Sequence, residues 1–192
     1  MQNPTLNKPL IALCVALSCA WATGASAMTK EEYKAANDRI GADYKTQKAR
    51  CDGMKGNAKD VCVSEAKGTE KVAKAELEAQ FKPTDKSPSK VMEAKADAAY
   101  DIAKEKCDDL AGNQKDVCVK DAKAAHVAAL GQAKVQKTSA TTGDPSKVAE
   151  ARKDAAEDRK DANYTAAKER CDAMSGANKD RCIADAKAKF GV

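Results

Sequence analysis

A motif of two cysteines separated by ten residues occurs three times in the chain, and it constrains the fold more than any other feature. The copies span residues 51–62, 107–118 and 171–182. They read C-D-G-M-K-G-N-A-K-D-V-C, C-D-D-L-A-G-N-Q-K-D-V-C and C-D-A-M-S-G-A-N-K-D-R-C. The first cysteines of successive copies are 56 and then 64 residues apart. The chain is therefore a tandem array of three related units.

The spacing decides between a straight helix and a hairpin. In a straight helix, Cys51 and Cys62 would share a face but lie ~16 Å apart along the axis. A disulfide needs Cα atoms about 4.4–6.8 Å apart. If the chain reverses at Gly56-Asn57, the two cysteines become mirror-related and face each other. We therefore predict helical hairpins, each with a disulfide near its turn: Cys51–Cys62, Cys107–Cys118 and Cys171–Cys182.

Small residues further along each hairpin support this geometry. Positions four before the first cysteine and four after the second should meet, and two of the three pairs are Ala–Ala. Such pairs allow helices to approach more closely than the usual ~8–10 Å. One layer further, a tyrosine faces a small or flexible residue. The pairs are Gln47/Ala66, Ala103/Ala122 and Ala167/Ala186, then Tyr44/Thr69, Tyr100/Ala125 and Tyr164/Lys189.

The first helix is predicted from about Lys30 to Lys55. Thr29 and Glu32 have the spacing of a capping box, in which each side chain accepts a hydrogen bond from the other residue's backbone. One face repeats at alternating spacings of three and four, as in a coiled coil. This face comprises Tyr33, Asn37, Ile40, Tyr44, Gln47, Cys51 and Met54.

The turn and the second helix follow from Gly56-Asn57. Gly56 suits a left-handed conformation after the first helix, and Asn57 suits the N-cap of the second. Asp60 would then lie in the first turn, where a carboxylate is favourable. The second helix is predicted over about 58–80, and Gly68 within it costs roughly 1 kcal/mol relative to alanine.

The other two units begin with a capping residue followed by proline. These are Ser87-Pro88 and Asp144-Pro145, and both fit an N-cap with proline at the first helical position. The linkers at about 81–86 and 137–143 are predicted to be flexible. The hairpins are assigned to residues 28–82, 87–136 and 144–192.

The N-terminal residues 1–27 have the features of a secretory signal peptide. Lys8 precedes a short apolar stretch over 10–22, and Ala25-Ser26-Ala27 fits a cleavage site. An uncleaved anchor and a lipoprotein signal at Cys19 are the alternatives. After cleavage we expect no transmembrane segment and a periplasmic or secreted protein.

The composition beyond residue 27 indicates helices with a small core. Only 18 of these 165 residues are Leu, Ile, Val or Phe, whereas 81 are Ala, Glu, Lys, Arg or Leu. This is the composition of long helices. The net charge is +4, from 33 basic and 29 acidic residues, and the two signs are interleaved. The charge therefore gives no reason to expect nucleic acid or a membrane surface as a partner.

The residues that could carry chemistry have a simpler structural interpretation. Zinc ligands usually come in closely spaced pairs, often with histidine, whereas His126 is alone and predicted to be an exposed helix residue. Metal or redox cysteines and intermolecular thiols remain as alternatives to the three disulfides. No catalytic motif is present, so we expect no enzyme, cofactor or metal. Recurrent charges beside the cysteines are interpreted as helix-end charges: Asp52, Asp108, Asp172, Lys59-Asp60, Lys115-Asp116 and Lys179-Asp180.

The signal features, the Ala/Lys-rich helices and the repeated C-D-x-[ML]-x-G-N-x-K-D-x-C motif resemble a group of exported proteobacterial proteins. Some of these are loosely labelled cell-envelope or TolA-like. The third copy departs from the motif at Ala177-Asn178 and at Arg181. The resemblance implies export and an envelope setting, with no activity or binding residues.

These observations favour an exported, non-enzymatic structural or interaction protein of the cell envelope. Its partner would be an envelope protein or another copy of the chain. The alternatives are a hydrophilic, partly disordered stress protectant and a periplasmic scavenger of small molecules or metals.

Overall fold

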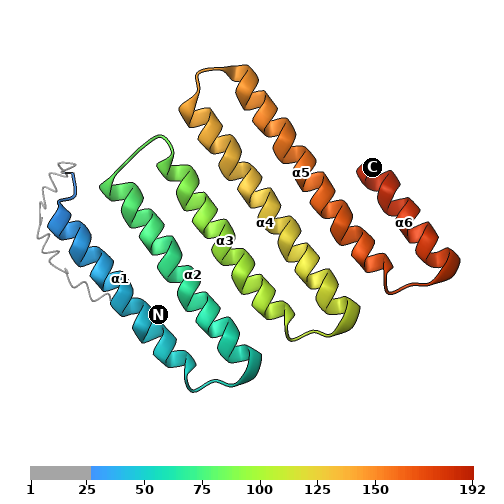
Figure 1. The fold of residues 1–192 in the computed structure, drawn as a ribbon, viewed down its shortest axis with the longest axis horizontal. Helices are drawn as coiled ribbons and strands as arrows, with labels where there is room; N and C mark the ends of the chain where they lie inside the picture. The colour runs from blue at the N-terminus through green and yellow to red at the C-terminus, as the bar shows by residue number, and fades with distance from the viewer. Residues whose placement is uncertain (1–26) are drawn as a thin grey trace, which may run out of the picture.

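The computed structural model describes residues 27–192, which form helices joined by turns (Figure 1). Almost all of the predicted signal peptide, residues 1–27, lies outside this part. The predicted all-α fold of three hairpins is confirmed. The helices are α1 (Lys30–Cys51), α2 (Gly56–Phe81), α3 (Ser87–Cys107), α4 (Gly112–Thr141), α5 (Pro145–Cys171) and α6 (Gly176–Phe190).

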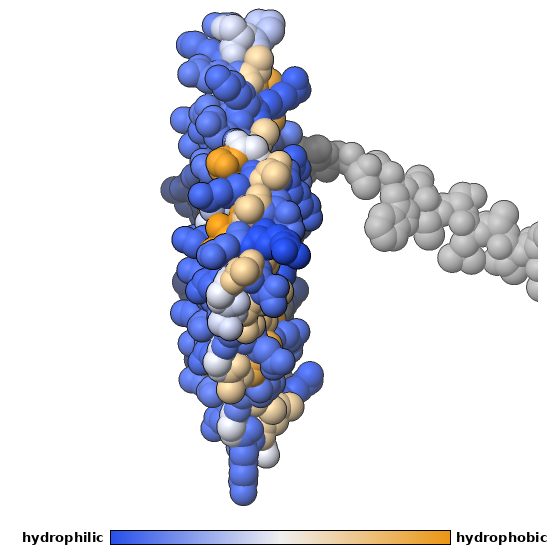
Figure 2. Space-filling model, turned by 90° about the vertical axis from the view of Figure 1, so that its right-hand side faces the viewer, coloured by the Kyte–Doolittle hydropathy of each residue, from blue (hydrophilic) through white to orange (hydrophobic). Residues whose placement is uncertain are grey.

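The helices lie side by side in a single antiparallel layer (Figure 1). Within residues 27–192, each helix packs only against its neighbours in the chain. Seen from the side of α5 and α6, the layer is a thin plate with a mainly hydrophilic surface and a narrow line of apolar residues (Figure 2). None of the described helices combines the length and apolarity that a membrane span requires.

The helix starts follow from local hydrogen bonds. The predicted capping box is confirmed: Thr29 Oγ1 accepts from the Glu32 amide at 3.1 Å, and Glu32 Oε2 accepts from the Thr29 amide at 2.8 Å. These hydrogen bonds lower the pKa of Glu32. Asp144 caps α5 as predicted, by accepting from the Ser146 amide at 2.9 Å.

The N-cap predicted at Ser87 is wrong. Lys86 occupies the cap position, and Ser87 is the first residue of α3. The Ser87 hydroxyl instead accepts from the Thr84 amide at 2.9 Å. Ser87 is buried. Its hydrogen bond to Thr84 holds the preceding linker against the start of the helix.

The turns are shaped differently from the sequence expectation. Helix α1 ends at Cys51 rather than near Lys55, and a four-residue turn follows. Gly56 has the expected positive φ, +57°, but it is the first residue of α2. Asn57 is therefore not the N-cap, and Asp60 lies beyond the first turn.

The second linker is shorter than predicted. Residues 137–141 belong to α4, which continues to Thr141. The start of α5 at Pro145 supplies a helix for this extension to pack against. The interfaces between successive hairpins, α2 with α3 and α4 with α5, are more extensive than those within hairpins. The hairpins consequently form one continuous layer.

The interior of the layer consists almost entirely of small side chains. Nine alanines, the first cysteine of each motif and one leucine make up the buried apolar residues. Alanine lets helix axes approach closely because its side chain ends at Cβ. The buried apolar residues are Cys51, Ala66, Leu77, Ala94, Ala96, Ala98, Cys107, Ala124, Ala133, Ala151, Ala166, Cys171 and Ala186.

Two glycines mark the closest approaches between hairpins. A Cβ at Gly68 would lie 3.1 Å from the Cβ of Ala98 on α3. A Cβ at Gly131 would lie 2.9 Å from the Cβ of Ala155 on α5, which is closer than two such carbons can come. Both glycines are unfavourable in a helix, but the close packing between hairpins requires them.

The disulfides are expected to supply a large share of the stability. Replacing Cys107 and Cys118 by alanine should lower the free energy of unfolding by roughly 3 kcal/mol, because the unfolded chain regains the freedom of the closed loop. Urea denaturation followed by circular dichroism measures this change. Peptide mapping of the unreduced native protein should recover three local disulfides. An unchanged urea midpoint, or a bond between hairpins, would contradict the expectation.

A matched pair of glycine substitutions tests the close packing. Gly131→Ala should destabilise the protein by about 1–3 kcal/mol, because the new methyl group overlaps Ala155. Gly41→Ala, with no atom within 4 Å of the new Cβ, should stabilise it by up to about 1 kcal/mol through helix propensity. Thermal unfolding compares the two variants, and equal effects would show that the α4–α5 interface is not tightly packed.

Candidate functional site

The six predicted cysteines form three disulfides, each across one hairpin turn. The pairs are Cys51–Cys62, Cys107–Cys118 and Cys171–Cys182, with Cα–Cα distances of 5.7, 5.6 and 5.7 Å. The first cysteine of each pair is fully buried. Three disulfides fit an extracellular or otherwise oxidising compartment. They leave none of these thiols free for catalysis or metal binding.

Each turn also carries an ion pair that recurs in all three copies. The aspartate after the first cysteine meets the lysine seven positions later, at the start of the next helix. This lysine offsets an acidic group at a helix C-terminus, where negative charge is unfavourable. In the third copy it lowers the pKa of Asp172. The pairs are Asp52–Lys59 at 3.4 Å, Asp108–Lys115 at 3.0 Å and Asp172–Lys179 at 2.8 Å.

The prediction of helix-end charge was correct for these aspartates but did not identify their lysine partners. The pairs are solvent-exposed, so each contributes little to stability. The second aspartates of the motifs, Asp60, Asp116 and Asp180, are exposed and form no ion pair with another described residue. The recurrent charges thus belong to the turn architecture.

The motif asparagine joins neighbouring hairpins. Asn57 Nδ2 donates to the carbonyl oxygen of Glu105 at 2.8 Å, and Asn113 Nδ2 donates to that of Glu169 at 2.8 Å. Both acceptors lie in the last turn of the next hairpin's first helix, where each carbonyl also accepts from the amide of the C-capping aspartate, Asp108 at 3.0 Å or Asp172 at 3.1 Å. Asn57 was predicted to cap its own helix, but its side-chain amide donates a hydrogen bond to the adjacent helix.

An ion pair accompanies each asparagine bridge. Glu65 lies 3.2 Å from Lys106, and Asp121 pairs with Arg170 at the equivalent positions one hairpin later. The acid is three residues after a second cysteine, and the base directly precedes the next first cysteine. Successive hairpins are therefore joined by the same two polar contacts.

The outer face of α6 does not reproduce these contacts. Ala177 and Arg181 hold the positions that Asn57 and Val61 hold on α2. Both are exposed, whereas Asn57 and Val61 are half-buried and Asn57 donates a hydrogen bond to α3. The departures of the third copy from the motif therefore fall on the face that has no described neighbour.

The outer face of α1 also has polar residues at positions where α3 has apolar ones. Asp38 and Thr46 hold the positions of Ala94 and Ile102 on α3. Ala94 is buried, and Ile102 lies against Gly68 of α2. Asp38 and Thr46 are exposed. Both outer edges are thus more polar than the interfaces between hairpins.

One side-chain cluster links three consecutive helices. Lys71 on α2 lies 2.8 Å from Asp97 on α3, and Asp97 lies 2.8 Å from His126 Nε2 on α4. His126 also stacks on Tyr100, with ring centroids 4.7 Å apart. These contacts correct the prediction of an exposed histidine, because the His126 side chain is only 10% exposed.

The cluster has the character of a structural contact. Hydrogen bonds from Lys71 and then His126 lower the pKa of Asp97 and keep it ionised. His126 Nδ1 is buried and has no hydrogen-bond partner among residues 27–192. Nor do the described His, Cys, Asp and Glu side chains gather in groups of three that could hold a metal ion.

One apolar position of the motif is exposed at every turn. Met54, Leu110 and Met174, each three residues after a first cysteine, are 44%, 40% and 46% exposed. Met54 was predicted on the face of α1 that repeats in coiled-coil register. It lies outside the hairpin because α1 ends three residues earlier, at Cys51.

The bridging asparagines can be tested against an internal control. Asn57→Ala and Asn113→Ala should each lower the free energy of unfolding by about 0.5–1.5 kcal/mol, because a half-buried hydrogen bond between hairpins is lost. Asn178→Ala changes an exposed asparagine of the third copy and should have an effect within about 0.5 kcal/mol. Urea denaturation compares the three variants, and similar effects in all three would contradict the bridging role.

Comparison with known proteins assigns no relative to this architecture. No family model, no curated protein and no solved structure matches the chain. The functional argument therefore depends on the residues and geometry of the chain itself.

Proposed function

We propose that this chain is an exported, non-enzymatic structural or interaction protein of the cell envelope. The observation that carries the proposal is the single layer of helices, in which each helix packs only on its chain neighbours. Such a layer leaves both broad faces of the plate open to solvent. Its fold therefore presents a large surface relative to its small interior.

The disulfides and the N-terminal sequence support the exported setting. Each disulfide closes a short local loop in a chain with few large apolar side chains, and small domains of this kind depend on such links outside the reducing cytosol. Residues 1–27 supply the sequence features of an export signal. Together these features favour the periplasm or the extracellular medium.

The packing of the helices favours this proposal over a disordered protectant. Asparagine bridges, ion pairs and glycine contacts join the hairpins at defined positions. A chain that acted only as a disordered hydrophilic polymer would have no use for such interfaces. The broad faces are then the surfaces on which a partner would bind.

Site-specific photo-crosslinking in a proteobacterial host tests the proposal. A photoreactive phenylalanine replaces the exposed Gln132 of α4 or Arg159 of α5, which line a shallow hollow. As matched controls, it replaces the exposed Lys34 or Lys45 of α1. We expect a discrete adduct with an envelope protein from the hollow, competed by unlabelled chain, and none from α1.

The same cells can be used to test whether the chain is exported. The chain recovered from the envelope fraction should begin near Met28, and its six remaining cysteines should resist alkylation until reduced. A full-length cytosolic chain with reactive thiols would contradict the exported setting. Absence of adducts from both positions in the hollow would contradict an interaction through that surface.

A further inference from the structure

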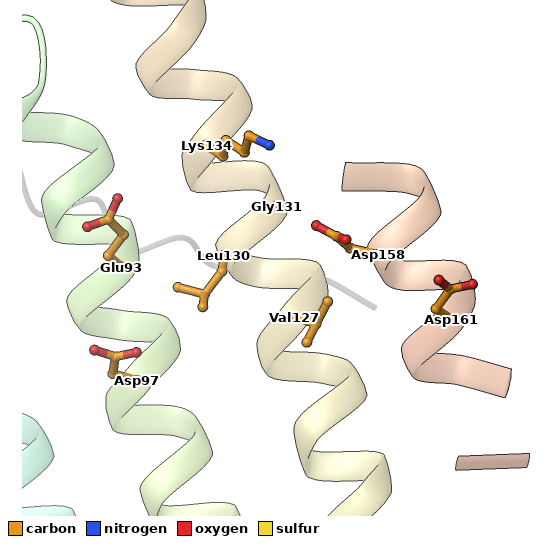
Figure 3. Close-up of a pocket in the computed structure, with 8 residues that line it drawn as sticks. All are labelled: Glu93, Asp97, Val127, Leu130, Gly131, Lys134, Asp158 and Asp161. Atoms are coloured by element: carbon orange, nitrogen blue, oxygen red, sulfur yellow. The ribbon is translucent and has the colours of Figure 1, made fainter. Parts of the chain in front are cut away.

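A shallow groove of about 630 Å³ lies along α4, between α3 and α5 (Figure 3). Val127, Leu130 and Gly131 of α4 form an apolar floor. Gly131 is buried, because Ala155 of α5 packs directly against it. Carboxylates line both sides, and one lysine lies at the end: Glu93 and Asp97 on α3, Asp158 and Asp161 on α5, and Lys134 on α4.

The charges of this groove are only partly compensated. Lys134 lies 2.9 Å from Asp154, outside the groove, and that contact raises the pKa of Lys134. Glu93, Asp158 and Asp161 form no ion pair with any residue of the described chain. The residues that line the groove carry a net charge of −3, although the chain as a whole carries +5.

The groove is specific to this part of the array and does not follow from the repeat. Counted from the second cysteine of each copy, Val127 and Leu130 hold the positions of Lys71 and Lys74 on α2. Apolar residues thus replace two lysines on an exposed face. On the sides, Glu93 and Asp97 stand in place of Asn37 and Gly41, and Asp158 stands in place of Ala94.

We propose that this groove binds a basic amphipathic helix of a partner protein. This inference rests on the proposed interaction function and names the surface and the chemistry of the partner. The partner's apolar stripe lies on Val127 and Leu130. Lysines or arginines on both sides of that stripe pair with the free carboxylates of α3 and α5.

Physical chemistry favours this occupant. An amphipathic helix commonly binds by laying its apolar face in a groove, anchored at positions one turn apart. Val127 and Leu130 of α4 have that spacing. Carboxylates on both sides select a basic helix and reject an acidic one, because like charges would face each other in the complex.

The test uses two designed peptides of 18 residues with the same leucine stripe. In one peptide lysines flank the stripe on both sides, and in the other glutamates take their place. Binding to the isotope-labelled, disulfide-intact protein is followed by amide chemical shifts. We expect the lysine peptide to shift residues of α3, α4 and α5 around the groove, and the glutamate peptide to cause no shifts.

Charge-matched variants distinguish the groove from general attraction. The triple variant Glu93→Gln, Asp158→Asn and Asp161→Asn should weaken binding of the lysine peptide by about tenfold, because three exposed ion pairs are lost. The control triple variant Glu31→Gln, Asp43→Asn and Asp85→Asn has the same net charge, and these exposed residues lie away from the groove. It should bind like the native chain.

Four results would overturn the proposal. Three of them are an equal loss of binding in both triple variants, shifts centred outside α3–α5, and no binding of the lysine peptide. The fourth is a response to spermidine alone, which would assign the groove to a small polyamine. Any of these results, combined with photo-crosslinks from Gln132 or Arg159, would refute the basic-helix proposal while leaving the interaction function in place.

Discussion

Close contact between alanine and glycine backbones is the constraint on which the rest of the structure depends. The chain has too few large apolar side chains to fill a core of ordinary thickness, so its helices gain contact by approaching closely. A Cβ at Gly131 would come within 2.9 Å of Ala155, which shows how little space remains between α4 and α5. Dispersion forces fall off steeply with distance, and short side chains use them well only when backbones nearly touch. The disulfides hold the turn ends of the hairpins at this short separation.

The polar contacts between hairpins give the layer its order. Close packing of alanine alone would tolerate sliding of one helix along another, because alanine faces look alike at every turn. Asn57 and Asn113 remove this freedom, since each amide must meet one carbonyl group of the next hairpin. The accompanying acid–base pairs specify the same alignment. Apolar contact thus brings the hairpins together, and hydrogen bonds fix their register.

The sequence was sufficient for the elements whose geometry is set locally. The mirror relation about Gly56-Asn57 gave the hairpins and the three disulfide pairs, and Thr29 with Glu32 gave the first cap. The sequence was insufficient to predict the role of a residue that contacts a neighbouring helix or hairpin. Asn57 is a residue type that favours the N-cap position, but its side chain donates to α3. Gly68 is unfavourable in a helix when considered alone, and its role becomes clear only when Ala98 is placed against it. His126 was predicted to be exposed because its partners, Asp97 and Tyr100, come from another helix. The acidic groove likewise requires knowing that α3 and α5 flank α4.

The local character of the disulfides has a consequence for how the protein matures. Each pair is separated by only 11 positions, whereas six cysteines allow about 15 complete pairings. In the export that we propose, both cysteines of one hairpin would enter the oxidising space before those of the next hairpin. Every native bond can therefore form before a competing thiol is present, in the order of the chain. Under this proposal, oxidation would follow the direction of export, and the array would assemble one hairpin at a time.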